Sequence, residues 1–200
     1  MGIRSGLFFM IVAAIIFWAV AVFRPPIWVF PVLFVSVFLF YSNTLRERVP
    51  LYLSNRKTWM ALSNLMNGHD VSGLKRPVFV DLGCGLGGAV AYLAKNHPDW
   101  HVVGVETAPG PYLVSKIRVA FQPNASIRFQ SLWNIDLKKV NMAYAFLSPV
   151  PMARLCQKIR AEMPIGGRFI SNSFWPDDEP YDEELWVKDK RQSHLISVVL

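Results

Sequence analysis

Hydrophobic residues are distributed so unevenly that they divide the chain into two parts. Residues 6–41 are almost continuously apolar, with Arg24 as the only charged residue. The run 6–23 would be about 27 Å long as a helix, close to the roughly 30 Å hydrocarbon core of a bilayer. Arg24, Pro25 and Pro26 interrupt it. The second run, 27–41, would span only about 22 Å.

Two arrangements of these apolar runs remain open. In the one we favour, they form a helical hairpin that turns at Arg24, Pro25 and Pro26. In the other, a single span is followed by an interfacial or re-entrant helix. One continuous helix is disfavoured because Arg24 near the bilayer centre would cost about 2.5–3.5 kcal/mol and the prolines would break the helix. A cleaved signal peptide is disfavoured because the apolar sequence resumes beyond residues 19–21, the candidate cleavage site. We expect a transmembrane anchor over residues 1–45.

Beyond residue 45 the pattern changes to short apolar runs that alternate with helical periodicity. Residues 46–76 are predicted to be a connector ending in a helix, because Trp59, Leu62 and Met66 recur at helical spacing before Asn67 and Gly68. Strands are predicted over 77–82, 100–106, 126–131, 142–147 and 168–173. Helices are predicted up to about residue 95 and over 111–121 and 151–163. Two last strands, 185–188 and 194–199, form a hairpin. Residues 77–200 therefore predict a doubly wound α/β domain, with a mostly parallel sheet and an antiparallel edge.

Charge and composition narrow the expected partners. The chain is 52% hydrophobic, only 18% charged, and carries a net charge of +7. Eight Lys/Arg against two Asp/Glu lie in residues 1–76, so the basic excess flanks the apolar segment, which is typical of a membrane protein and not of a nucleic-acid reader. We expect a bilayer partner, no nucleic acid, and a domain on the cytoplasmic or matrix side of an inner or cytoplasmic membrane. Cys84, Cys156 and the four histidines have no ligand spacing, so we expect no metal.

The candidate chemistry lies in a Gly-rich turn over residues 80–88, Val-Asp-Leu-Gly-Cys-Gly-Leu-Gly-Gly. Glycines between a strand and a helix let the backbone approach a ligand closely, and the following helix N-terminus offers unpaired N–H groups. Glu106, at the end of the next predicted strand, is placed to accept hydrogen bonds from ribose hydroxyls. Together these features predict an adenosine-containing ligand.

The same turn could also be read as a dinucleotide fingerprint, since Gly83, Gly85 and Gly88 satisfy GxGxxG. Asp81, two residues before the first glycine, argues against that reading and suits a ligand with a cationic end, such as the methionine ammonium of S-adenosylmethionine (SAM). Few residues remain after the fifth strand for a dehydrogenase's substrate domain. We therefore favour SAM over NAD(P) or FAD, and a turn without a ligand is the remaining alternative.

Residues 80–87, Glu106 and the turn 163–167 resemble the motifs of class I, seven-strand SAM-dependent methyltransferases. This resemblance implies that the cofactor's methionine half lies beside Asp81 and the turn, that Glu106 holds the ribose, and that the segment after the third strand lies beside adenine. Many members carry an acid where Ser131 stands here. The residues so assigned to the cofactor are Asp81, Gly83, Cys84 (as a small residue between glycines), Gly85, Gly87, Glu106, Ser131, Leu132 and Trp133.

A narrower resemblance concerns the order of segments: an apolar N-terminus, the lead-in 49–52, residues 104–106, residues 132–137 and a last strand at 186–189. This order is similar to that of the small membrane-anchored lysine methyltransferases that modify the ATP synthase c-subunit and the adenine nucleotide translocase in mitochondria. The fourth strand ends in Leu147-Ser148-Pro149, which differs from the Asn-Pro-Pro-Tyr-like motif of amide- and adenine-N-methylating relatives.

The resemblance implies protein lysine methylation of a membrane protein. A lysine acceptor can lose its proton through desolvation, so no dedicated base is required. Ser148 and Tyr52 are the candidate polar groups at the acceptor. Two alternatives remain open: methylation of a lipid, quinone or other apolar small molecule, and a catalytically silent SAM-binding scaffold.

Overall fold

The computed structural model describes residues 22, 24–47, 52–189 and 192–200. The chain divides into two compact units, Met1–Phe38 and Leu39–Leu200. The predicted apolar run 6–23 falls almost wholly outside the described residues. The second run corresponds to helix α2, Val29–Glu47. No helix in the described part of the chain combines the length and apolar character needed to cross a membrane.

A seven-stranded sheet forms the centre of the second unit, in the order β3-β2-β1-β4-β5-β7-β6. Five strands are parallel: β1 (Val78–Leu82), β2 (His101–Glu106), β3 (Ala125–Phe129), β4 (Met142–Ala145) and β5 (Arg168–Asn172). The last two, β6 (Glu183–Trp186) and β7 (His194–Val199), pair antiparallel, and β7 also pairs antiparallel with β5. The predicted mostly parallel sheet with a C-terminal antiparallel hairpin is confirmed.

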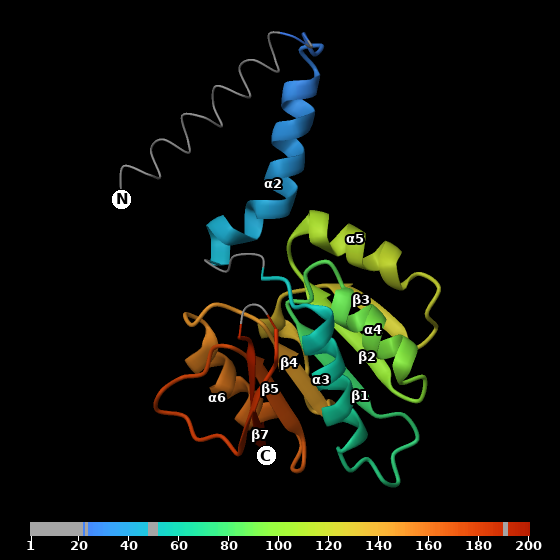
Figure 1. The fold of residues 1–200 in the computed structure, drawn as a ribbon, viewed down its shortest axis with the longest axis vertical. Helices are drawn as coiled ribbons and strands as arrows, with labels where there is room; N and C mark the ends of the chain where they lie inside the picture. The colour runs from blue at the N-terminus through green and yellow to red at the C-terminus, as the bar shows by residue number, and fades with distance from the viewer. Residues whose placement is uncertain (1–21, 23, 48–51, 190–191) are drawn as a thin grey trace. The chain divides into compact units, whose positions relative to one another are not determined.

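Helices cover both faces of this sheet. Helices α3 (Arg56–Asn67), α4 (Gly88–Asn96) and α5 (Pro109–Val119) lie on one face, and α6 (Met152–Glu162) lies on the other (Figure 1). Successive strand residues point to opposite faces, so Phe79 belongs to the core beneath α3 and α4, and Val80 to the core beneath α6. A strand buried on both sides reads as a continuous apolar run, which is the pattern that predicted these strands.

The connection from β3 to β4 departs from the regular alternation of strands and helices. It contains only the short 3-10 helix η1, Leu132–Asn134, followed by irregular chain. Leu132, Ile135 and Leu137 from this segment are buried in the core on the α6 side. Irregular backbone therefore covers part of the second face where a doubly wound fold usually has a helix.

The predicted connector helix is integrated into the domain. Asn55 caps α3, because its side-chain oxygen accepts hydrogen bonds from the backbone N–H groups of Lys57 and Thr58. The Asn55 amide also donates to Asp189, and the Lys57 ammonium donates to the Lys188 carbonyl oxygen. The start of α3 is thus tied to the turn that follows β6.

Candidate functional site

The Gly-rich turn joins β1 to α4 and comes very close to two neighbouring helices. Gly87 has φ 71°, which is the left-handed region that glycine adopts readily. A Cβ on Gly87 would lie 2.7 Å from Ser115 Cβ in α5, and one on Gly88 would lie 2.4 Å from a ring carbon of Trp59 in α3. Only glycine fits at these positions, so the first turn of α4 packs directly against α3 and α5.

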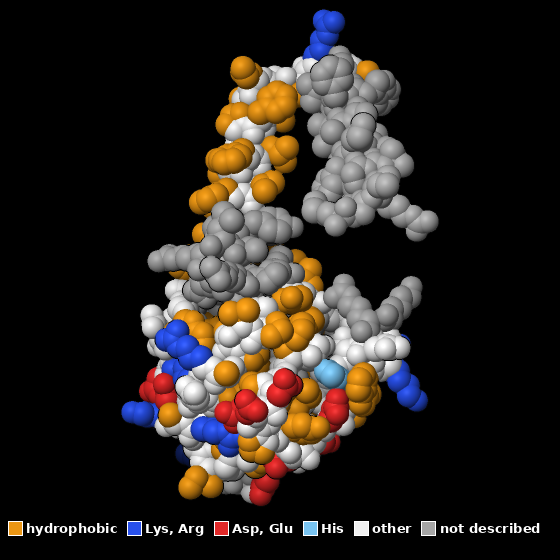
Figure 2. Space-filling model, turned by 90° about the vertical axis from the view of Figure 1, so that its left-hand side faces the viewer, with side chains coloured by type: hydrophobic (Ala, Val, Ile, Leu, Met, Phe, Trp, Pro, Cys, Tyr) orange, Lys and Arg blue, Asp and Glu red, His pale blue; other side chains and the backbone are white. Residues whose placement is uncertain are grey.

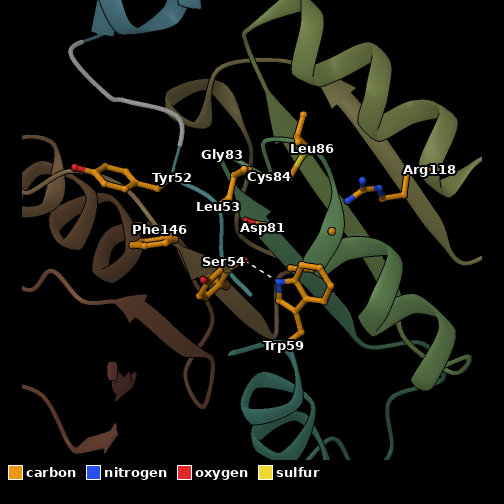
Figure 3. Close-up of a pocket in the computed structure, with 13 residues that line it drawn as sticks. Tyr52, Leu53, Ser54, Trp59, Asp81, Gly83, Cys84, Leu86, Arg118 and Phe146 are labelled. Atoms are coloured by element: carbon orange, nitrogen blue, oxygen red, sulfur yellow. Dashed lines mark hydrogen bonds between the residues drawn. The ribbon is translucent and has the colours of Figure 1, made fainter. Parts of the chain in front are cut away.

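A cavity of about 190 Å³ opens at the carboxyl ends of β1 and β4, beside the Gly-rich turn (Figure 3). The segment before α3 and the last turn of α5 contribute to its walls. It is lined by Tyr52, Leu53, Ser54, Trp59, Asp81, Gly83, Cys84, Leu86, Gly88, Ala89, Arg118, Tyr144 and Phe146.

Asp81 is the acidic group of this cavity. It is only 3% exposed, and no residue described by the structure makes a hydrogen bond or an ion pair with its carboxyl group. Burial raises the pKa of Asp81 to about 8, and the charge of Glu106 contributes to the rise. A buried carboxylate without a partner is unfavourable, and a ligand cation would satisfy it. This is the feature expected of a site that holds an ammonium or sulfonium group, so the residues present fit SAM.

Two further polar groups surround Asp81. Tyr144, its register partner on β4, is buried, and burial together with the charge of Asp81 raises the pKa of its phenol. The Tyr144 hydroxyl accepts a 3.1 Å hydrogen bond from the Asn172 amide. Burial also raises the pKa of the Cys84 thiol, so this thiol is neutral at physiological pH. Its sulfur would lie 2.7 Å from a Cβ placed on Gly104, and Cys84 therefore occupies a tight space between strands.

Glu106 holds the turn in place. Its Oε2 accepts a 2.9 Å hydrogen bond from the Gly85 N–H, and its Oε1 accepts 2.8 Å bonds from the N–H groups of Thr107 and Ala108. Glu106 does not line the cavity. The structure thus gives it a contact with the turn that the sequence did not predict.

The residues expected beside adenine lie after β3, next to the end of β2. The Gln130 N–H donates to the Glu106 carbonyl oxygen at 3.2 Å. The Ser131 hydroxyl accepts from the Trp133 N–H at 3.3 Å and caps η1. Leu132 is buried, and the Arg154 guanidinium stacks over the Trp133 ring, 4.0 Å from its centroid. The structure thus brings these residues together beside the carboxyl ends of β2 and β3, outside the 190 Å³ cavity.

The two acceptor candidates lie at the β4 side of the site. The Tyr52 ring is 5.1 Å from the Phe146 ring and 5.8 Å from the Phe174 ring. We call these three residues the aromatic wall. Ser148 is buried just beyond β4 and does not line the cavity.

Sequence reasoning missed several lining residues. Trp59 served there only to predict a helix, whereas its indole N–H donates to the Ser54 hydroxyl at 2.8 Å and both residues line the cavity. Arg118 and Phe146 carried no motif that could have identified them. Trp59 has the spacing of an ordinary residue on an amphipathic helix, and this spacing does not reveal that it lies in the first turn of α3, next to the Gly-rich turn.

The acidic stretch 177–184 contributes to ion pairs within the domain. Glu179 pairs with Arg160 and Glu183 with Arg168, each at 2.9 Å, and a Glu184 carboxylate oxygen lies 2.9 Å from Nδ1 of His194. On the face over α6, acidic and basic side chains lie close to one another (Figure 2). In the part of the chain that the structure describes, no group of His, Cys, Asp and Glu side chains could hold a metal ion.

Comparison with solved structures identifies the fold. An RNA methyltransferase from Salinibacter ruber in complex with S-adenosyl-L-homocysteine is 17% identical, with a TM-score of 0.63 over 74% of this chain and 93% of that one. Precorrin-6y C5,15-methyltransferase from Geobacter metallireducens is 12% identical, with a TM-score of 0.57 over 76% and 93% of the two chains. A MtNAS mutant in complex with S-adenosylmethionine is 15% identical, with a TM-score of 0.57 over 72% and 61%. At these identities the likeness establishes the fold.

Comparison of sequences identifies the family. No curated protein sequence matches the chain, but residues 81–180 match the model of the ANTKMT methyltransferase domain. This match confirms the predicted resemblance to class I methyltransferases of that type, and with it the expectation of SAM as cofactor. Because the match covers half of the chain and begins in the cofactor turn, the chain belongs to the ANTKMT methyltransferase domain family and is a SAM-dependent methyltransferase.

Proposed function

We propose that this protein is a membrane-anchored methyltransferase that modifies a lysine side chain of a membrane protein. The observation that carries the proposal is the combination, in one cavity, of a buried carboxylate, Asp81, that pairs with none of the described residues, and the aromatic rings of Tyr52 and Phe146. The carboxylate suits a cationic cofactor, and the rings suit an aliphatic amine. The family match supports the same reading.

On the cofactor side, Asp81 would hold the methionine ammonium, and the backbone of Gly83, Cys84 and Gly85 would surround the methionine half. The Arg118 side chain lines the cavity close to the first turn of α4, where a ligand carboxylate would meet both a guanidinium and unpaired helix N–H groups. Glu106 and the Ser131–Trp133 segment would lie beside the ribose and adenine. Bound SAM supplies an electrophilic methyl group on a sulfonium.

On the acceptor side, the chain's contribution is to remove water from an amine. A lysine with a free pKa of about 10.4 costs about 4.6 kcal/mol to deprotonate at pH 7, at 1.36 kcal/mol per unit. Apolar surroundings lower this cost because they disfavour the ammonium form, and the aromatic wall provides such surroundings. The same rings stabilise a methylated, cationic product by roughly 0.5–2 kcal/mol per contact.

Hydroxyl and carbon acceptors fit less well, because their activation calls for a general base. Among the described residues that line the cavity there is no histidine, and Asp81 is its carboxylate. An amine that becomes nucleophilic through desolvation needs no such base. Alignment of the acceptor with the donor could then contribute up to about 7–11 kcal/mol to the rate.

Membrane attachment is supported by the apolar sequence of residues 6–41 and by helix α2. Large apolar side chains along α2 are exposed, among them Leu33, Phe34 and Phe38. Exposed apolar surface of this kind is stable in lipid and unfavourable in water. With the basic residues that flank the apolar runs, it favours an integral protein of an inner or cytoplasmic membrane, with the catalytic domain on the cytoplasmic or matrix side.

The test uses the full chain and isolated membranes from cells that lack it, incubated with methyl-labelled SAM. We expect the label in protein, and methyllysine after acid hydrolysis. Asp81→Asn is the inactive control, and Asp99→Asn, a change at an exposed aspartate outside the site, is the matched active control. Label in the lipid extract would instead indicate a lipid or quinone acceptor, and nuclease-sensitive label an RNA acceptor. SAM binding without transfer to any fraction would indicate a scaffold.

A further inference from the structure

The edge of the domain formed by α5 and β3 carries an unusual concentration of exposed apolar side chains. Leu113 and Ile117 are 56% and 75% exposed, and Phe121, just beyond the helix, is 98% exposed. Leu113 and Ile117 are four residues apart, so they lie on one face of α5. Phe121 continues the same spacing just beyond the end of the helix. Phe129, at the end of β3, is 58% exposed, and its ring lies 5.0 Å from that of Tyr112 on α5. We call Leu113, Ile117, Phe121 and Phe129 the α5–β3 edge.

The charges on helix α5 all have one sign. Residues 107–127 contain no Asp or Glu, and their charged residues are Lys116 and Arg118. Both are exposed. Lys116 follows Tyr112 by four residues and Leu113 by three, so it lies next to both on the helix surface. Arg128 precedes Phe129 on β3 and therefore points to the opposite face of the strand, where it lines a pocket with Asp136 and Lys139. By contrast, acids and bases are mixed on the face over α6, where they form ion pairs (Figure 2).

An apolar face on a helix whose charged residues are all basic matches the surface chemistry of an anionic bilayer. Apolar side chains enter the boundary between headgroups and acyl chains, while lysine and arginine attract anionic lipids. Protein interfaces are commonly depleted of lysine, whereas Lys116 lies on the same helix surface as Leu113. Scattered exposed apolar residues are normal on soluble domains, but four on one edge are not.

We propose that the α5–β3 edge inserts into the interfacial region of an anionic lipid bilayer, as a membrane contact separate from the N-terminal apolar segment. This contact would fix the orientation of the catalytic domain against the membrane. Because α5 also contributes Arg118 to the cavity, the cavity would then be held at the level of the lipid headgroups. The inference goes beyond the proposed function and does not depend on the identity of the methyl acceptor.

The experiment places an environment-sensitive fluorophore on the full chain through Ile117→Cys. The native thiols, Cys84 and Cys156, are buried, so the new thiol is labelled selectively. The labelled protein is reconstituted with vesicles of phosphatidylcholine and phosphatidylglycerol that contain brominated acyl chains. Ile165→Cys is the matched control, because Ile165 is 98% exposed but lies in the loop before β5. We expect a blue shift and quenching at position 117, the same result with Leu113→Cys, and neither effect at position 165.

The charge contribution is tested in the background of Ile117→Cys with Lys116→Gln, and Arg128→Gln, on the opposite face of β3, is the matched control. A basic residue close to an anionic surface contributes about 1 kcal/mol, or about a fivefold change in binding. The ratio of lipid-embedded to water-exposed label should therefore fall about fivefold with Lys116→Gln and stay unchanged with Arg128→Gln, and high salt should reproduce part of the loss in the parent protein.

Three results would overturn the proposal. The label at position 117 could remain in water while the protein is bound to vesicles, or the protein could fail to bind vesicles at all. The label could also change its environment without lipid as protein concentration rises, which would assign the edge to a second copy of the chain. None of these measurements depends on methyl transfer, so they can fail while the proposed enzymatic function stands.

Discussion

Replacing Asp81 with asparagine is expected to stabilise the ligand-free protein near neutral pH and to remove most of its affinity for the cofactor. The pKa of Asp81 rises from 3.8 to about 8, chiefly because the carboxyl group is buried and secondarily because Glu106 is close. Between those two values the folded protein holds a proton that the unfolded chain has lost. The free energy of unfolding should therefore fall as pH rises, by about 1.4 kcal/mol per pH unit.

The magnitude follows from the width of that window. Four pH units correspond to an upper limit of about 6 kcal/mol at pH 8, and three to about 4 kcal/mol at pH 7. Asparagine has nearly the same shape and does not ionise, so the variant should lack this slope. Its advantage in urea unfolding should be largest at pH 8 and close to zero at pH 4. Asp99→Asn, at an exposed position, should leave the difference in the free energy of unfolding between pH 4 and pH 8 the same as in the parent protein.

Cofactor binding should show the complementary pH dependence. A ligand ammonium pairs with the ionised carboxylate, and the ionised fraction of a group with a pKa of about 8 rises roughly fiftyfold between pH 6 and pH 8. Affinity for S-adenosylhomocysteine, measured by calorimetry, should therefore rise between pH 6 and pH 8 in the parent protein and be weak and nearly flat over the same range in Asp81→Asn. A parent affinity that does not vary with pH, or a variant that binds equally well, would refute this assignment of Asp81.

Three further changes test packing and hydrogen bonds within the domain. Gly88→Ala should lower the free energy of unfolding by about 1–3 kcal/mol, because its Cβ would meet the Trp59 ring at 2.4 Å. In a Trp59→Leu background this loss should drop below about 1 kcal/mol, and an equal loss there would rule out the clash. Tyr52→Ala should reduce kcat/KM for the acceptor by about ten- to a hundredfold, since two ring contacts of about 0.5–1.5 kcal/mol each are lost. Tyr52→Phe should retain activity, and an equal loss in both variants would show that the hydroxyl group, and not the ring, is required. Asn124→Ala should destabilise the domain by at least about 2–3 kcal/mol in thermal unfolding, because the buried Asn124 amide donates to the carbonyls of Ala94, His97 and Trp100. A change below about 1 kcal/mol would show that water replaces the amide as the donor to these carbonyls.

The sheet was predictable because its strands are short apolar runs with clear ends. Residues 77–82 and 168–173 were placed to within a residue or two, since burial on both faces leaves a pattern that depends only on local sequence. The predicted strand 142–147 was too long, because Phe146 leaves the sheet and lines the cavity instead. The last two strands were correctly predicted to pair with each other, but the sequence did not show that β7 lies between β5 and β6. No local pattern specifies the place of a strand within a sheet.

The cofactor turn was predictable for the same local reason, since glycine spacing and Asp81 lie within nine residues. The remaining cavity walls come from segments distant in sequence. Arg118, Trp59 and Phe146 meet only because α5, α3 and β4 pack around the turn, and each alone is an ordinary helix or loop residue. The second contact of Asn55, with Asp189, is likewise invisible in sequence because 134 positions separate the two residues.

That last contact has a consequence for biosynthesis. The segment that precedes α3 supplies one wall of the cavity, and Asn55 and Lys57 anchor it to Asp189 and Lys188, which follow β6. A nascent polypeptide emerging from the ribosome would carry its glycine turn long before it carried these two residues. The wall would therefore be fixed in place only after β6 has been translated, so the complete cofactor cavity forms late in folding.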